Sequence, residues 1–276
     1  MKHTLAVGLI VAISSALPTP AANGVILEVA QNTVTARIEL PGNITADLEL
    51  QFEQALGLNA ESIGLSARLI DPTDLNITSR LPSSVGVPVA FPILITIDPS
   101  PSGPLAFSGI VSINLHTHNL TYTPNSPLRL FSAETGKAFQ DITASTGLGS
   151  YRTGANKGGF SEFLIAADVR PVDTVISDKF QRLQAKLDGN AKSIAGGVLA
   201  TLQSSLAAAR DAYLANDALG ASERIREFAD AVKKNSGASI PDVWRSTRDV
   251  VNVAGELRSG ASTLKFSLLF KASLGG

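Results

Sequence analysis

The sequence predicts an α+β protein, in which an immunoglobulin-like antiparallel β-sandwich is followed by a four-helix bundle. Before residue 172, short runs of alternating apolar and polar residues are separated by turn residues such as Gly and Pro, which is typical of antiparallel strands. After that point apolar residues recur every three or four positions, as on an amphipathic helix. The charge changes at the same place, because residues 24–172 hold 8 basic and 13 acidic side chains and residues 173–276 hold 14 and 11. We therefore predict a sandwich domain over 24–171, a helical domain over 173–260 and a tail over 261–276.

Residues 1–22 have the features of a secretory signal peptide. Lys2 and His3 form a short basic segment, an apolar run follows from Leu5 to Ile13, and small residues and prolines come next. This run is shorter than the roughly 20 apolar residues that a membrane-spanning helix needs, and no later stretch is long enough either. We expect the segment to be cleaved, and the mature chain, with no transmembrane segment, to be secreted or periplasmic.

Strand-like segments follow one another through the sandwich domain and are predicted to form roughly eight or nine strands. Residues 24–40 contain two of them, joined by a turn at Gln31-Asn32, and the segment ADLELQFE (46–53) alternates strictly, as a half-buried strand does. Further strands are predicted within 62–70, 89–97, 107–122, 128–133, 138–144, 149–153 and 159–169. The regular spacing of strands and turns favours a sandwich.

Four helices with short connections are predicted in the helical domain. The first three cover 173–187, 193–215 and 218–234, and the third carries Ile225, Phe228 and Val232 on one face. The fourth is predicted to begin at Ser239, with Pro241 in its first turn, and to continue to about residue 258. The apolar segment LKFSLLF (264–270) in the tail fits either a strand or a short helix.

Residues 202–251 resemble the FIMAH-type domains of bacterial surface and secreted proteins. The resemblance lies in the Leu- and Ala-rich helix, the Ile, Phe and Val positions of the next helix, and the Ser-Gly stop near Gly237. The segment 128–170, with its Phe160-Ser161-Glu162-Phe163 strand, looks like the last strands of sandwich modules in exported bacterial proteins. The FIMAH resemblance implies an envelope or extracellular setting without enzyme activity of its own. The chain as a whole resembles an uncharacterised family of exported bacterial proteins that pairs these two parts, and no established function comes with that resemblance.

Composition excludes several classes of function. The chain has no Cys, which rules out disulfides, thiol nucleophiles and thiolate metal sites. Its net charge of −1 gives no general attraction to nucleic acid. The glycine-rich segment GANKGG (154–159) lacks the spacing of a phosphate-binding loop and is predicted as a hairpin loop, so no cofactor is expected. No Gly-x-Ser-x-Gly motif surrounds a serine, and Ser150 lies between turn residues.

His116 and His118, in the segment SINLHTHNLTY (112–122), are the candidate metal ligands. Residues two apart on a strand point to the same side, and here that side is the polar one. Two imidazoles can share a zinc or copper ion if a carboxylate from a neighbouring strand completes the site. Two solvent-exposed histidines on a bent strand are the alternative, because the apolar side switches near His118 and predicts a bulge there.

The expected function is therefore that of an exported, non-catalytic binding or structural module of the bacterial cell envelope or extracellular space. The predicted partner is an envelope saccharide or another exported protein, and nucleic acid is not expected. Two alternatives remain open. One is a metal-binding protein or hydrolase that uses His116 and His118, and the other is an assembly factor for another exported protein.

Overall fold

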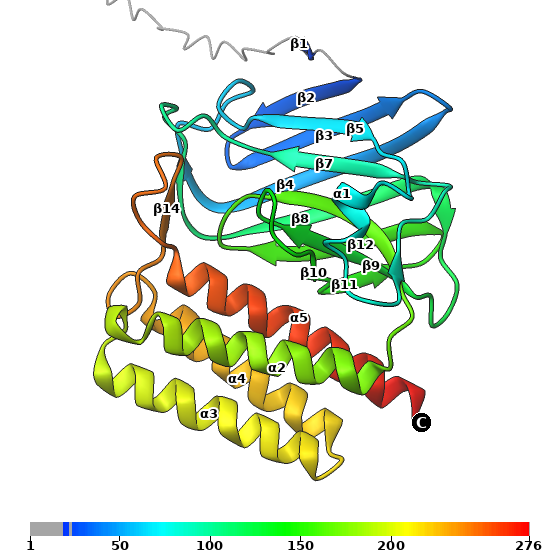
Figure 1. The fold of residues 1–276 in the computed structure, drawn as a ribbon. Helices are drawn as coiled ribbons and strands as arrows, with labels where there is room; N and C mark the ends of the chain where they lie inside the picture. Colours follow the sequence, from blue (N-terminus) through cyan, green and yellow to red (C-terminus); the bar gives the residue numbers. More distant parts are fainter. Residues whose placement is uncertain (1–18, 22–23, 276) are drawn as a thin grey trace, which may run out of the picture.

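The computed structural model describes residues 19–21 and 24–275, and in this part of the chain two antiparallel sheets are combined with a group of helices (Figure 1). Apart from 19–21, the predicted signal segment 1–22 lies outside the described residues. The α+β class is confirmed, with the strands first and the long helices after them.

The first sheet has eight strands. Their order is β1 (Thr19–Ala21), β2 (Val25–Ala30), β3 (Thr33–Leu40), β4 (Ile44–Leu56), β8 (Ala106–Thr121), β12 (Ser150–Lys157) and β11 (Ser145–Gly147), and β14 (Val243–Arg245) pairs with β8. The second sheet has six: β10 (Gln140–Asp141), β9 (Leu128–Ala133), β13 (Glu162–Asp168), β7 (Ile93–Ile97) and β5 (Leu65–Leu69) in this order, with β6 (Val85–Gly86) beside β13. The predicted turn after β2 is confirmed, and Gln31 adopts a φ of 52° there.

The predicted alternation of side chains determines where the main core lies. Inward residues of both sheets, such as Ile38, Leu50, Val111 and Ile165, form one continuous buried cluster. The opposite face of the second sheet is covered by the segment that contains the short helix α1 (Leu75–Thr78), whose Ile77 is buried. The opposite face of the first sheet carries the polar residues of each alternating strand.

The helices lie on one side of the two sheets, with α5 nearest to the sheets and α3 farthest from them (Figure 1). They are α2 (Val172–Gly189), the 3-10 turn η1 (Ala191–Ser193), α3 (Gly196–Leu214), α4 (Ala218–Asn235) and α5 (Val253–Leu274). Their apolar sides form a core of their own, in which Ile225, Phe228 and Val232 are fully buried, as the sequence predicts. Within the described residues, no helix combines the length and the apolarity needed to cross a bilayer.

The last predicted helix is wrong in its boundaries. Ser239 and Pro241 do not begin a helix; the chain from 236 to 252 is irregular and contributes β14 to the first sheet. The reason is Trp244, whose ring stacks on Phe107 at 5.3 Å between ring centroids, inside the core of the sheets. Burial of this large aromatic ring outweighs the local helix signals.

Helix α5 begins only at Val253 and includes the tail. Its N-cap is Asn252, whose side-chain oxygen accepts a hydrogen bond from the Gly255 amide at 2.7 Å. The segment 264–270 is therefore helical, and no break in structure occurs at residues 260–261. The predicted hairpin loop at 154–159 is also wrong, because residues 154–157 belong to β12 and the chain then passes to β13 in the other sheet.

Polar contacts join the helices to the sheets. Arg258 in α5 binds both carboxylate oxygens of Glu53 in β4 at 2.7 Å. Gly158, after β12, approaches α5 so closely that a Cβ atom there would lie 2.5 Å from the Glu256 amide nitrogen. The strands end at Asp168 and the helices begin at Val172. The division into separate domains at this point stays a prediction.

Candidate metal centre

His116 and His118 lie near the end of the long strand β8, on the side of the first sheet that faces away from the core. Up to Thr117 the odd-numbered residues of β8 are buried, and the next buried residue is Leu120. The pairing with β12 shifts in the same place, because Arg152 pairs with His116 whereas Ser150 pairs with Thr121. The predicted irregularity near His118 is thus confirmed. Both imidazoles lie on the same side of the sheet, as residues two apart on a strand do, and their ring centroids are 4.4 Å apart.

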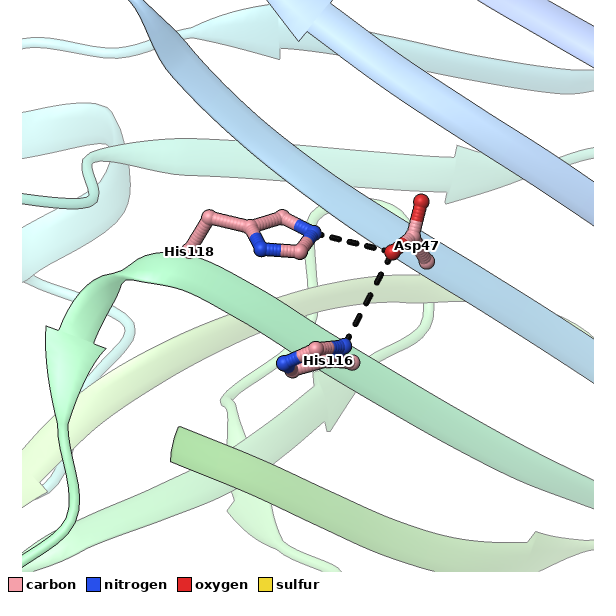
Figure 2. Close-up of side chains that lie close together, drawn as sticks. All are labelled: Asp47, His116 and His118. Carbon is pink, nitrogen blue, oxygen red and sulfur yellow. Dashed lines mark hydrogen bonds and ion pairs between the residues drawn. The ribbon is translucent and has the colours of Figure 1, made fainter. Parts of the chain in front are cut away.

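Asp47 in β4 completes the group (Figure 2). The register of the sheet places Asp47 directly opposite His116. Asp47 Oδ2 lies 2.8 Å from His118 Nε2 and 3.7 Å from His116 Nδ1. The side chains of His116, His118 and Asp47 keep 24%, 40% and 48% of their surface accessible, so an ion from solution can reach all three.

The spacing of these atoms suits a transition metal. One ligand atom from each residue can be chosen so that all three lie within 4.8 Å of one another. Ligands of a tetrahedral zinc ion, each about 2.0–2.1 Å from the metal, lie about 3.3–3.4 Å from one another. The two contacts of Asp47, 2.8 and 3.7 Å, lie on either side of that value, and the three ligand atoms together lie within 4.8 Å of one another, so side-chain rotations would have to draw them together around an ion. Three protein ligands leave at least one coordination position for water or a bound molecule.

Two neighbours of His116 favour its role as a ligand. Its Nε2 atom lies 2.5 Å from the Ser150 hydroxyl. With a proton on Nε2 donated to that oxygen, Nδ1 is left unprotonated and free to bind a metal. Burial, and then the charges of Arg152 and His118, lower the pKa of His116 against the opposing effect of Asp47. The neutral imidazole, which is the ligand form, is favoured as a result.

A groove of about 700 Å³ crosses the strands at this site and includes Asp47 and His116 in its lining. Outward-facing residues form two parallel rows across six strands, since each residue pairs with the next one in the sheet register. The first row is Ile26, Arg37, Asp47, His116, Arg152 and Gly147, and the second row is Glu28, Thr35, Glu49, Asn114, Gly154 and Ser145.

Glycine deepens one end of this groove. A Cβ atom on Gly154 would lie 2.5 Å from the Ser145 hydroxyl and 3.1 Å from the side-chain oxygen of Asn114. The missing side chain therefore leaves room for both polar groups beside the first row. Most residues that line the groove are polar or charged, with Ile26, Ala36, Leu48 and Leu115 between them, and the groove is open to solvent.

A model of a family of unknown function (DUF6689) matches residues 7–272. The chain belongs to this family. The match covers both the sheets and the helices of this family member, which agrees with the expectation that the chain pairs these two parts in an uncharacterised family. No curated protein matches the chain.

Other residues of types that often bind metals or saccharides have structural roles in this family member. Asp74 is the N-cap of α1, where its carboxylate accepts from the Asn76 amide at 2.9 Å, and Asp71 accepts from the Thr73 amide at 2.8 Å. Trp244 is buried in the core of the sheets and presents no surface for stacking.

The sequence indicates the two histidines but not their partners. Asp47 is 69 residues before His116 in the chain, and its place on the polar side of β4 is the only local signal. Ser150 and Arg152 reach the site because β12 is the other neighbour of β8. These contacts depend on strand order and register, which alternation alone does not specify.

Proposed function

We propose that this protein is a non-catalytic binding module whose surface groove holds a divalent transition-metal ion between Asp47, His116 and His118. The observation that carries the proposal is the convergence of two imidazoles and one carboxylate from adjacent strands. Imidazole nitrogen is a preferred ligand of zinc, copper and nickel, whereas calcium and magnesium require more oxygen ligands than this site offers.

Metal titration of the purified protein tests the proposal. Zinc should bind with one-to-one stoichiometry and raise the melting temperature, since an ion at 100 times its dissociation constant adds about 2.7 kcal/mol of stability. The double variant His116→Ala/His118→Ala should lose this binding, and Asp47→Asn should weaken it at least tenfold. Glu61→Gln, at an exposed turn away from the site, is the matched control and should bind zinc normally. Equal zinc binding by the double variant and the unchanged protein would refute the proposal.

A hydrolase is the second candidate, because the side chains of Ser150, His116 and Asp47 follow one another in space as Ser, His and Asp do in a serine triad. Ser150 Oγ lies 2.5 Å from His116 Nε2, but Asp47 lies 3.7 Å from Nδ1, which is longer than a hydrogen bond. Asp47 is also about half exposed, and its shorter contact is with His118. Hydrolysis of a p-nitrophenyl ester that is abolished by Ser150→Ala and unaffected by a chelator would favour this candidate over the metal site.

We also propose that the chain is exported to the bacterial envelope or beyond, with residues 1–22 as a signal peptide. The basic, apolar and small-residue order of this segment supports export. In the same proposal the two sheets form an immunoglobulin-like sandwich, α2–α5 form a four-helix bundle, and the helices are related to FIMAH-type domains. The separate cores of the sheets and of the helices support this description. N-terminal sequencing of the protein from periplasm and medium tests the export proposal. An intact Met1, found in the cytoplasm alone, would refute export.

A further inference from the structure

The two rows of the groove carry different polar side chains around the candidate metal centre: among the described residues, the first row holds an unpaired arginine, and the second holds carboxylates and an amide. Arg152 is exposed, and within the described residues it makes no ion pair; its one side-chain hydrogen bond, to the Leu148 carbonyl, measures 3.4 Å. Arg37, in contrast, pairs with Glu39 at 2.6 Å. The first row therefore places an unpaired guanidinium directly beside His116. A bound divalent ion would add positive charge at the adjacent position.

The second row offers hydrogen-bonding groups of another kind. Glu28, Glu49 and Asn114 point into the groove, and their side chains have no hydrogen bond to any other described residue. Carboxylate and amide oxygens accept hydrogen bonds from hydroxyl groups, and the amide also donates. Two carboxylates in this row repel a polyanion such as a nucleic acid backbone, so the row selects for uncharged hydroxyl groups.

The shape of the groove favours an extended ligand. Six strands at about 4.8 Å spacing give each row a length of about 24 Å. The strands from β2 to β12 are hydrogen-bonded on both sides, so a peptide cannot extend the sheet along the middle of the groove, and of the groove's described strands only β11 at one end has a free edge. Ile26, 39% exposed at one end of the first row, offers the only large apolar contact among the residues of the two rows.

We infer that the groove binds an acidic saccharide, whose carboxylate lies on the metal ion and Arg152 and whose hydroxyl groups bind Glu49, Asn114 and Glu28. This inference rests on the proposed function, because the ion supplies one of the two contacts to the carboxylate. A guanidinium and a metal ion beside hydroxyl acceptors match a ligand that carries one negative charge among many hydroxyl groups.

Titration calorimetry with three probes tests the inference. The probes are a glucuronosyl-glucose disaccharide, the neutral disaccharide cellobiose, and acetate, each added to zinc-loaded protein and to chelator-treated protein. The acidic disaccharide should bind the zinc-loaded protein at least tenfold more tightly than either other probe, and at least tenfold more weakly after the metal is removed.

Variants separate the contacts of the saccharide from those of the metal. Arg152→Gln should weaken binding of the acidic disaccharide about tenfold or more, because a charged hydrogen bond is lost. Glu49→Gln should weaken binding of both disaccharides and leave acetate unaffected. Glu49→Gln should bind zinc like the unchanged protein, Arg152→Gln is compared with the unchanged protein at saturating zinc, and Arg68→Gln, an exposed arginine on β5 of the other sheet, should change nothing.

The failures of the two proposals can be told apart. If zinc binds normally but the acidic disaccharide binds no more tightly than acetate or cellobiose, the saccharide inference is overturned and the metal centre stands. If zinc does not bind, the proposed function fails, and equal binding of the acidic disaccharide with and without a chelator overturns the metal contact in the inference as well.

Discussion

The buried ion pair between Lys179 and Asp141 connects the helices to the second sheet. Lys179 Nζ in α2 lies 2.6 Å from Asp141 Oδ2 in β10, and only 1% of each side chain is exposed. The same ammonium group donates hydrogen bonds to the Thr263 carbonyl at 3.2 Å and to the Ser267 hydroxyl at 2.9 Å, both in α5. We predict that Lys179→Met lowers the free energy of unfolding by about 3–5 kcal/mol, because the Asp141 carboxylate stays buried without its cation.

Urea unfolding followed by two signals measures this loss. Trp244 is the one tryptophan of the chain and reports on the core of the sheets, while far-ultraviolet circular dichroism reports on the helices. A loss of this size moves the midpoint by more than about 1 M if the dependence on urea is about 3 kcal/mol per M. Both signals should shift, because the pair joins the two parts. The control Lys192→Met, at an exposed position in η1, should change stability by less than about 0.5 kcal/mol.

The double variant Lys179→Met/Asp141→Leu gives the sharper comparison. With both charges removed, no buried ion is left unpaired, so most of the lost stability should return. A single variant that costs no more than Lys192→Met would show that the pair is not buried in solution. A double variant as unstable as the sum of both single changes would show that the two charges do not interact.

Two further predictions concern the contact between α5, β14 and the sheets. Burial alone would raise the pKa of Glu256, but Lys186 and Lys157 hold it at about 2. Because this pKa lies below the usual 4.5, the carboxylate stabilises the fold above pH 4.5 by about 1–3 kcal/mol, and this contribution should be lost as the pH falls toward 2. As the pH is lowered from 4.5 toward 2, the free energy of unfolding should therefore fall less steeply in Glu256→Gln than in the unchanged protein. An unchanged slope would contradict the low pKa of Glu256. Trp244→Ala should destabilise the protein by about 3–5 kcal/mol in urea because a buried aromatic ring is removed. Val243→Ala, at a more exposed neighbour, should cost much less, and equal effects would indicate that the ring is not buried.

The sequence by itself determined the local structure wherever a single repeat pattern was present. Strict alternation in residues 46–53 was enough to place Leu48 and Leu50 inside and Asp47 and Glu49 outside, as the structure shows. The three- and four-residue spacing of Ile225, Phe228 and Val232 likewise predicted α4 nearly to its ends. Side-chain direction in both cases follows from backbone geometry within a few residues.

Only the tertiary structure decided the features that depend on which segments meet. The helix signals at Ser239 and Pro241 were overridden because burial of Trp244 against Phe107, far away in the chain, is worth more than a helix cap. The candidate metal centre has the same origin. His116 and His118 face one way for local reasons, but Asp47 joins them only through the pairing of β4 with β8. A shift of one residue in that pairing would turn the carboxylate away, and no local repeat in the sequence specifies that register.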